Sequence, residues 1–210
     1  MDNAIEIVLA DYDARAAAEH KLMQELPPKE LARRIDEFLI SVGPNTGRLM
    51  NLLIKEAKAR TILELGTSYG YSAIWLAEAA RATGGKLISS DVHPGKQDHA
   101  RAQLAKAGLL DYVEFRLGDA RKTIAALETP LDFVLIDLWK ELYIPCFDLC
   151  YPKLSRGAVI VADNMLYPEI YLEQGRHYRT HVQSKPEMQT VLLSVGSGIA
   201  LSRYAAETTG

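Results

Sequence analysis

Residues 62–77 read ILELGTSYGYSAIWLA, and this stretch decides the fold. A short apolar run ends at Leu65, a turn with two glycines follows, and a helical pattern begins near Tyr71. Gly66 and Gly70 allow the backbone to approach a ligand closely, and the start of the following helix presents free N–H groups to an anionic group. The stretch therefore predicts a strand, a ligand-binding turn and a helix in direct succession.

The glycine spacing argues against a dinucleotide site. That fingerprint needs G-x-G-x-x-G, and the turn offers only G-x-x-x-G. Glu64 also lies where a pyrophosphate would have to pass, and a carboxylate there suits a ligand that carries an ammonium group. The second predicted strand is followed by Asp91, which is placed to accept hydrogen bonds from ribose hydroxyls. A ribose, an ammonium and a carboxylate without phosphate describe S-adenosylmethionine.

Short apolar runs alternate with helical patterns along most of the chain. The predicted strands are residues 61–65, 86–90, 112–116, 133–136, 159–162, 190–195 and 199–203. The predicted helices between the first five strands are residues 71–81, 97–107, 120–127 and 143–154. This order predicts an α/β fold with a Rossmann-like, seven-stranded, mostly parallel sheet and helices on both faces. The last two strands, joined by Gly196-Ser197-Gly198, predict a C-terminal antiparallel hairpin.

Length and composition indicate one domain. The chain has 210 residues, of which 48% are apolar and 24% charged, as in globular proteins with a sizeable core. We expect a single domain over residues 1–210, with a helical extension at 1–41 and a cofactor- and metal-binding core at 42–204. For the extension, an acceptor lid and a dimer contact both stay open.

The net charge and the cysteine content limit the classes of partner and of binding site that the sequence allows. A net charge of -3 gives no electrostatic reason to expect nucleic acid or an anionic membrane. No segment approaches the roughly 18 apolar residues of a membrane span, and the first residues carry acids where a secretory signal carries Lys or Arg. Only Cys146 and Cys150 are present, so neither a disulfide framework nor a four-cysteine zinc site is expected. We expect a cytoplasmic homodimer that acts on a small molecule.

Two further apolar runs end abruptly in an acid. Residues 133–140 read FVLIDLWK and residues 159–164 read VIVADN. If these strands are neighbours, Asp137 and Asp163 can reach one ion, and Asn164 supplies a third oxygen ligand. Three oxygen donors without His or Cys favour a hard cation, Mg²⁺ before Ca²⁺ or Mn²⁺.

Such an ion would activate a substrate with adjacent hydroxyls. It lowers the pKa of a bound hydroxyl, so that a phenolate nucleophile can form near neutral pH. Lys140, three residues after Asp137, is placed to take the proton. The phenolate would then attack the sulfonium methyl group in line.

The first motif resembles that of class I methyltransferases, in particular the cation-dependent catechol and caffeoyl-CoA O-methyltransferase group. The pattern E-x-G-x-x-x-G-x-S is common to both, and the resemblance runs from about residue 42 to residue 203. It implies that the methionine part of the cofactor is surrounded by Glu64, Gly66, Tyr69, Gly70 and Ser72. It also implies that Asp91 holds the ribose, that Asp119 meets the adenine amine, and that residues 42–53 close over the cofactor.

The segment DLWK is similar to a second motif of the same group. The resemblance implies that Asp137 binds Mg²⁺ and also lies at the cofactor, that Trp139 packs on the adenine, and that Lys140 is the general base. The segment ADN matches the pair that completes the metal site with Asp163 and Asn164.

Together these patterns predict an S-adenosylmethionine-dependent, Mg²⁺-dependent O-methyltransferase for a small, aromatic, vicinal-diol acceptor. A metal-independent methyltransferase of the same fold and a non-catalytic S-adenosylmethionine-binding protein stay open as alternatives. Ser197 occupies the hairpin turn where caffeoyl-CoA relatives carry an Asp, which leaves the acceptor open. His177 and His181 lie four apart on a predicted helix, where solvent-facing histidines are favoured over a transition-metal site.

Overall fold

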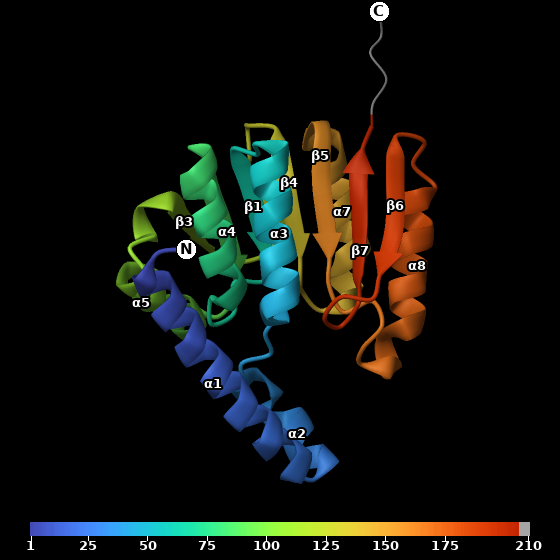
Figure 1. The fold of residues 1–210 in the computed structure, drawn as a ribbon. Helices are drawn as coiled ribbons and strands as arrows, with labels where there is room; N and C mark the ends of the chain where they lie inside the picture. The colour runs from blue at the N-terminus through green and yellow to red at the C-terminus, as the bar shows by residue number, and fades with distance from the viewer. Residues whose placement is uncertain (206–210) are drawn as a thin grey trace, which may run out of the picture.

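A seven-stranded sheet lies at the centre of the computed structural model, which describes residues 1–205 (Figure 1). The strands are β1 (Thr61–Leu65), β2 (Lys86–Asp91), β3 (Val113–Leu117), β4 (Leu131–Ile136), β5 (Leu154–Ala162), β6 (Met188–Leu193) and β7 (Ile199–Tyr204). Their order in the sheet is β3-β2-β1-β4-β5-β7-β6. Strands β1 to β5 pair in parallel, and β7 runs antiparallel to both β5 and β6. The predicted fold class, with its C-terminal antiparallel hairpin, is confirmed.

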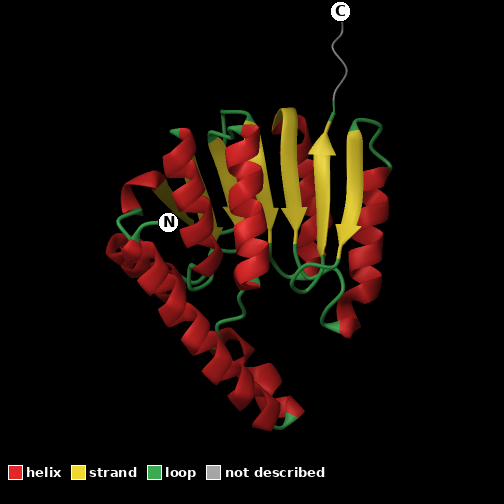
Figure 2. Cartoon of the chain, viewed as in Figure 1, coloured by secondary structure: helices red, strands yellow, loops and turns green. Residues whose placement is uncertain are grey.

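Helices cover both faces of the sheet (Figure 2). The α-helices are α1 (Asn3–Glu25), α2 (Pro28–Arg34), α3 (Gly43–Ala57), α4 (Tyr71–Thr83), α5 (Pro94–Lys106), α6 (Ala120–Ala125), α7 (Tyr143–Cys150) and α8 (Leu172–Gln183). Short 3-10 helices are η1 (Ile35–Glu37), η2 (Leu110–Tyr112), η3 (Lys140–Leu142), η4 (Tyr151–Lys153) and η5 (Glu169–Tyr171). The elements alternate as strand and helix through β5, as the sequence predicts.

Alternate residues of the central strands build two separate cores. Phe133 and Leu135 of β4 pack with α1, α3, α4 and α5, whereas Val134 and Ile136 pack with α6, α7 and α8. Successive side chains of a strand point to opposite faces, so a strand buried on both faces must be apolar throughout. This requirement explains why the central strands appear in the sequence as continuous apolar runs.

Some element bounds differ from the prediction for local reasons. β5 begins at Leu154, five residues before the predicted start. The sequence did not reveal this beginning, because residues 155–157 are exposed or half-buried and lack the apolar pattern. β6 spans Met188–Leu193 because the hairpin register pairs Leu193 with Ile199 and leaves residues 194–198 for the turn. α7 ends at Cys150 and passes into η4, which contains Pro152.

The N-terminal arm, residues 1–41, projects past the edge of the sheet (Figure 1). The buried side chains of α1 all lie in its first half, namely Ile5, Val8, Leu9 and Tyr12. They join the core that also contains α3 and α4. None of the helices within residues 1–205 is long and apolar enough to cross a membrane.

The carboxyl ends of β1 to β5 all lie at one edge of the sheet, which we call the carboxyl edge (Figure 2). The strand order reverses between β1 and β4, since β2 and β3 lie on one side and β5 on the other. In open sheets of this kind, ligands bind at such a switch point. The arm projects beyond this same edge.

Candidate active site

The turn after β1 has a backbone that only glycine readily adopts. Gly66 and Gly70 have φ angles of +103° and +95°. A Cβ on Gly66 would lie 2.0 Å from the backbone oxygen of Asp137. The turn therefore packs so closely against the residue after β4 that no side chain fits between them. We call residues 66–70 the glycine loop. It lies directly at the switch point of the sheet.

Glu64 precedes this loop and is fully buried. Ser89 of β2 donates its hydroxyl hydrogen to Oε2 at 2.5 Å, while Oε1 has no hydrogen-bond partner within residues 1–205. Burial raises the pKa of Glu64 to about 8, and the nearby hydroxyls of Ser72 and Ser89 oppose the rise. A buried carboxylate oxygen without a partner fits a ligand that brings an ammonium group. Sequence reasoning missed Ser89, although a Ser pair in an apolar strand was its visible signal.

Asp91 is a second carboxylate at the carboxyl edge, at the end of β2. Its two carboxylate oxygens accept hydrogen bonds from the backbone N–H groups of Ser68, at 2.7 Å, and His93, at 2.8 Å. The side chain therefore connects the glycine loop to the loop after β2. Carboxylate oxygens have further lone pairs, so Asp91 can still accept from ribose hydroxyls.

Two residues expected at the cofactor have other contacts in the structure. The ring of Tyr69 lies under the guanidinium of Arg15, 4.1 Å from its centre, and so faces the N-terminal arm. Asp119 caps α6 by accepting from the backbone N–H of Arg121 at 2.8 Å. Hydrogen bonds from the side chain and the backbone N–H of Arg121 lower the pKa of Asp119 to about 2. Both residues nevertheless lie at the carboxyl edge.

Asp137 and Asp163 lie at the ends of neighbouring strands, as expected. β4 and β5 pair in register up to Ile136 and Ala162, and the Asp163 N–H donates to the Ile136 oxygen at 3.2 Å. Asp163 is buried, and its Oδ1 has no hydrogen-bond partner within the described chain. Burial raises the pKa of both carboxyls, and for Asp163 the Asp137 charge adds to the rise.

These oxygens fit a cation. Asn164 follows Asp163 with a φ angle of +55°, a conformation that Asn tolerates better than most residues. An unpartnered buried carboxylate oxygen, a second half-buried carboxylate and an amide next to it form the donor set that a hard divalent ion prefers.

Lys140 lies over this acidic pair. Its Nζ donates to the backbone oxygen of Asp163 at 2.8 Å and lies 3.7 Å from the ring centre of Tyr143. Burial lowers the pKa of Lys140 to about 8, and the charges of Asp137 and Asp163 oppose the change. The Tyr143 hydroxyl donates to the same oxygen of Asp163 at 3.2 Å. Sequence reasoning took Tyr143 only as a helix start.

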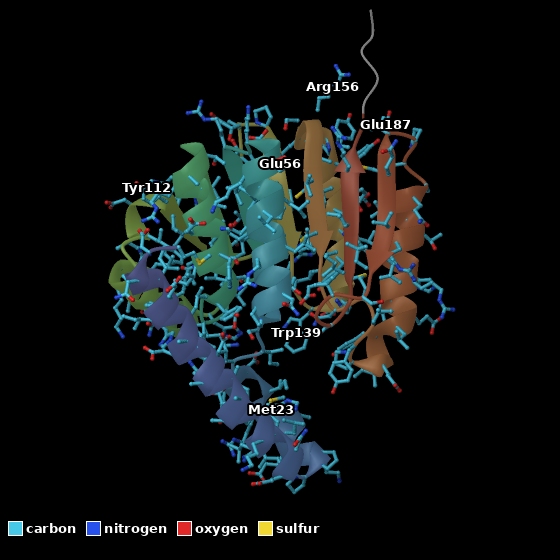
Figure 3. The ribbon with its side chains drawn as sticks, viewed as in Figure 1. Met23, Glu56, Tyr112, Trp139, Arg156 and Glu187 are labelled. Atoms are coloured by element: carbon cyan, nitrogen blue, oxygen red, sulfur yellow. The ribbon has the colours of Figure 1, made fainter. Side chains whose placement is uncertain are left out.

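Trp139 lies below the ends of the strands and is 49% exposed (Figure 3). Tyr167, at 63%, and Ile170, at 75%, are also exposed, and both lie in the segment after Asn164. By contrast, Tyr178 is buried in the core against Tyr143. Indole rings are mostly buried in folded proteins, so the exposure of Trp139 is unusual. Its exposed face could stack against a planar ligand.

The two histidines of α8 contact different carboxylates. His181 is 2.7 Å from Asp148, and His177 is 4.0 Å from Glu173 with 69% of its side chain exposed. They do not converge on a common point, as a metal site would require.

A family model described as O-methyltransferase matches residues 13–205. The chain belongs to this O-methyltransferase family. The resemblance found in the glycine loop and in the segment DLWK is therefore confirmed.

Individual relatives agree with this membership. The chain is 39% identical over 132 residues to catechol O-methyltransferase of Niastella koreensis and 37% identical over 128 residues to that of Mycobacterium tuberculosis. Each match covers 60% of the chain but only 59% and 58% of the relatives' lengths. The crystal structure of an O-methyltransferase from Bacillus cereus in complex with SAH is 26% identical, with a TM-score of 0.75 over 97% of this chain and 91% of that one.

Proposed function

We propose that the chain is an S-adenosylmethionine-dependent, divalent-cation-dependent O-methyltransferase whose acceptor is a small aromatic molecule with adjacent hydroxyls. One observation carries the proposal: two buried carboxylate oxygens, Glu64 Oε1 and Asp163 Oδ1, have no partner within residues 1–205 and flank the switch point. Family membership and relatives named catechol O-methyltransferase support the same reaction class.

Several side chains would bind the methyl donor. Glu64 would accept hydrogen bonds from its ammonium group, and Asp91 from its ribose hydroxyls. The absence of side chains at Gly66 and Gly70 would allow close approach of the ligand. Trp139 would cover the adenine.

Asp137, Asp163 and Asn164 would hold a hard divalent cation, because the donors are oxygens. We expect Mg²⁺ before Ca²⁺ or Mn²⁺, because three protein ligands leave positions for water and substrate. When bound, S-adenosylmethionine supplies a sulfonium methyl group and the cation stabilises the ionised form of an acceptor hydroxyl. The side chains of the protein would orient the methyl donor and the acceptor and would provide a group that accepts the proton.

Lys140 Nζ would accept that proton. Its hydrogen bond to the Asp163 oxygen fixes Nζ at the carboxyl edge, at hydrogen-bonding distance from the loop that would hold the cation, and the neutral amine is the form that accepts the proton. Tyr143 supports the arrangement from below, because it donates to the same oxygen and lies under Nζ. A base fixed beside its substrate hydroxyl needs no rearrangement before proton transfer.

The test is a methyl-transfer screen over a panel of diphenols, with Mg²⁺ or with EDTA, on wild type and on Asp137→Ala. We expect turnover that EDTA abolishes and added Mg²⁺ restores, and at most traces in the variant. Equal activity in EDTA would support the metal-independent alternative. Calorimetric binding of S-adenosylmethionine without turnover on any acceptor would support the non-catalytic one.

Assembly and location stay predictions. On the side of the sheet where α3 lies, no helix within residues 1–205 covers β6 and β7, and Val191 of β6 is 53% exposed (Figure 1). Sedimentation velocity tests the predicted homodimer, and fractionation of the native cells tests the predicted cytoplasmic location.

A further inference from the structure

The N-terminal arm contacts the glycine loop directly. Tyr12 of α1 is only 3% exposed, and its hydroxyl donates to the backbone oxygen of Tyr69 at 2.5 Å. A Cβ on Gly70 would lie 3.3 Å from the same hydroxyl oxygen. Tyr12 therefore contacts two consecutive residues of the loop, across 57 positions of sequence.

The side chain of Tyr69 is held from two sides. The guanidinium of Arg15 lies 4.1 Å from its ring centre, and the ammonium of Lys96 lies 5.5 Å from it. Its hydroxyl donates to the backbone oxygen of Glu37 at 3.2 Å. Arg15 is itself oriented by Glu19, at 2.7 Å. Cation–π contacts and a hydrogen bond together fix the ring against the arm.

The end of the arm is tied into the same cluster. The Leu39 N–H donates to the Glu19 carboxylate, and Lys96 pairs with Asp36 at 3.3 Å. Residues 36–39 lead within a few positions to the start of α3. The arm thus connects the glycine loop with the segment before α3.

The glycine loop needs such support because its backbone is strained. Ser68 has a φ angle of +46°, which costs a non-glycine residue roughly 1 to 2 kcal/mol, whereas Gly66 and Gly70 adopt their positive φ angles without that cost. A loop of this kind keeps one conformation only when its surroundings hold it there. A loop already held in its bound conformation loses less entropy when the ligand binds.

We propose that Tyr12 and Arg15 are positioning residues, which hold the glycine loop in the conformation that binds the methyl donor. The inference rests on the proposed function, since it takes the loop as the donor site. It assigns a role to the arm, for which the sequence left an acceptor lid and a dimer contact open.

A matched control lies on the same pair of helices. Tyr71 donates its hydroxyl hydrogen to Asp13 of α1 at 3.0 Å, and its ring packs edge-on against Tyr12 at 5.7 Å. This bond joins α1 to α4 but does not reach the backbone of the loop. Tyr71→Phe and Tyr12→Phe therefore each remove one hydroxyl from the arm contact, and only the second removes a contact to the loop.

The first measurement is hydrogen exchange of the amides of residues 66–70 in the protein without donor. We expect exchange about 10-fold faster in Tyr12→Phe, as loss of one hydrogen bond predicts, and little change in Tyr71→Phe. Equal exchange in the two variants would overturn the proposal.

The second measurement is donor binding by calorimetry, with steady-state kinetics. We expect the Kd and KM for S-adenosylmethionine to rise about 10-fold in Tyr12→Phe and to change less than about 2-fold in Tyr71→Phe. In both variants kcat and the KM for the acceptor should stay at the wild-type values. Arg15→Ala should behave like Tyr12→Phe, and Arg15→Lys should recover part of the affinity.

The outcomes separate this proposal from the proposed function. If wild type binds no S-adenosylmethionine, the proposed function fails, whereas the exchange measurement still decides whether the arm holds the loop. If wild type binds and Tyr12→Phe binds equally well, the positioning role is wrong. Should Tyr12→Phe fail to fold, Arg15→Ala and Arg15→Lys carry the same test.

Discussion

Glu64 is the residue whose chemistry depends most on burial. It is fully enclosed, and only one of its two carboxylate oxygens has a hydrogen-bond partner within the described chain. The folded protein therefore favours the neutral carboxyl and raises its pKa to about 8. A cationic group brought by a ligand would reverse that preference.

This shift predicts a pH dependence of stability. Between about pH 5 and pH 8 the unfolded chain has an ionised Glu64 and the folded chain a protonated one, so folding takes up a proton and stability falls as pH rises. We expect the Tm of wild type without donor to fall relative to that of Glu64→Gln across this range. Thermal unfolding at several pH values measures it, and parallel Tm profiles would show that Glu64 does not titrate as stated.

Lys140 carries the second prediction. Lys140→Met keeps the length of the side chain but removes the proton acceptor, so turnover should fall roughly 10²- to 10⁴-fold, the usual contribution of a general base. Lys153→Met is the matched control, because Lys153 Nζ also donates to backbone oxygens, those of Ala125 and Leu127, but far from the site. Initial rates at saturating donor decide the matter, and a Lys140→Met enzyme of near-normal rate would exclude the base role.

Sequence reasoning found residues at strand ends better than residues that reach the site from elsewhere. Asp137 and Asp163 could be placed together because parallel strands end at one edge, and the pairing of β4 with β5 confirms that placement. Ser89 and Tyr143 were missed, since their role depends on side-chain contacts across strands and loops. The catalytic and metal roles themselves stay predictions.

The turn between β1 and α4 has no room for a side chain at Gly66. An Ala at Gly66 would place its Cβ 2.0 Å from a backbone oxygen, while the glycine that ends α4, Gly84, has a φ angle of +66° but no described heavy atom within 4 Å. Both substitutions strain the backbone, but only the first also forces two elements apart.

We therefore expect Gly66→Ala to lose stability by roughly 3 kcal/mol or more, and Gly84→Ala by about 1 to 2 kcal/mol. Urea unfolding measures both free energies. Donor binding should be lost in Gly66→Ala and retained in Gly84→Ala. Similar losses for the two variants would mean that the loop relaxes away from the Asp137 oxygen.

Element type was predicted well, and element bounds less so. Apolar runs identify strands buried on both faces, but β5 extends to Leu154 through residues that are only partly buried. The hairpin register follows from pairing with β7, which no local pattern reveals. Tertiary contacts, not local propensity, set these ends.

The two cysteine thiols are buried inside the folded molecule. Cys146 and Cys150 of α7 are fully buried in the core that α6, α7 and α8 form on one face of the sheet, and burial raises the pKa of Cys146 to about 11. Thiolates form and react only when this core opens. The rate at which the thiols react therefore reports on opening of this core.

We expect a thiol reagent to label the native protein slowly and both cysteines rapidly in urea. S-adenosylmethionine should slow native labelling further, because a ligand that binds only the folded state lowers the open population. Mass spectrometry over time measures both rates. Rapid labelling of native protein would show that α7 opens locally.

At the scale of the whole molecule, the mostly parallel sheet and the helical layers on its two faces followed from the sequence, because strand and helix alternate and crossovers are right-handed. The placement of the arm did not. Its contacts with the glycine loop join residues far apart in the chain, and nothing in the helical pattern of residues 1–41 identifies the loop as their target.

The position of β7 has a consequence for biosynthesis. β7 is the last strand of the described chain, yet it lies between β5 and β6, and the turn before it provides the carbonyls of Ser197 and Gly198 that accept the amides of residues 165–167. A nascent or prematurely terminated chain without β7 would expose β5 as an unpaired edge and leave the loop after Asp163 unsupported. Unpaired edges are what chaperones and proteases encounter, so translation must reach β7 before the loop after Asp163 can take its final form.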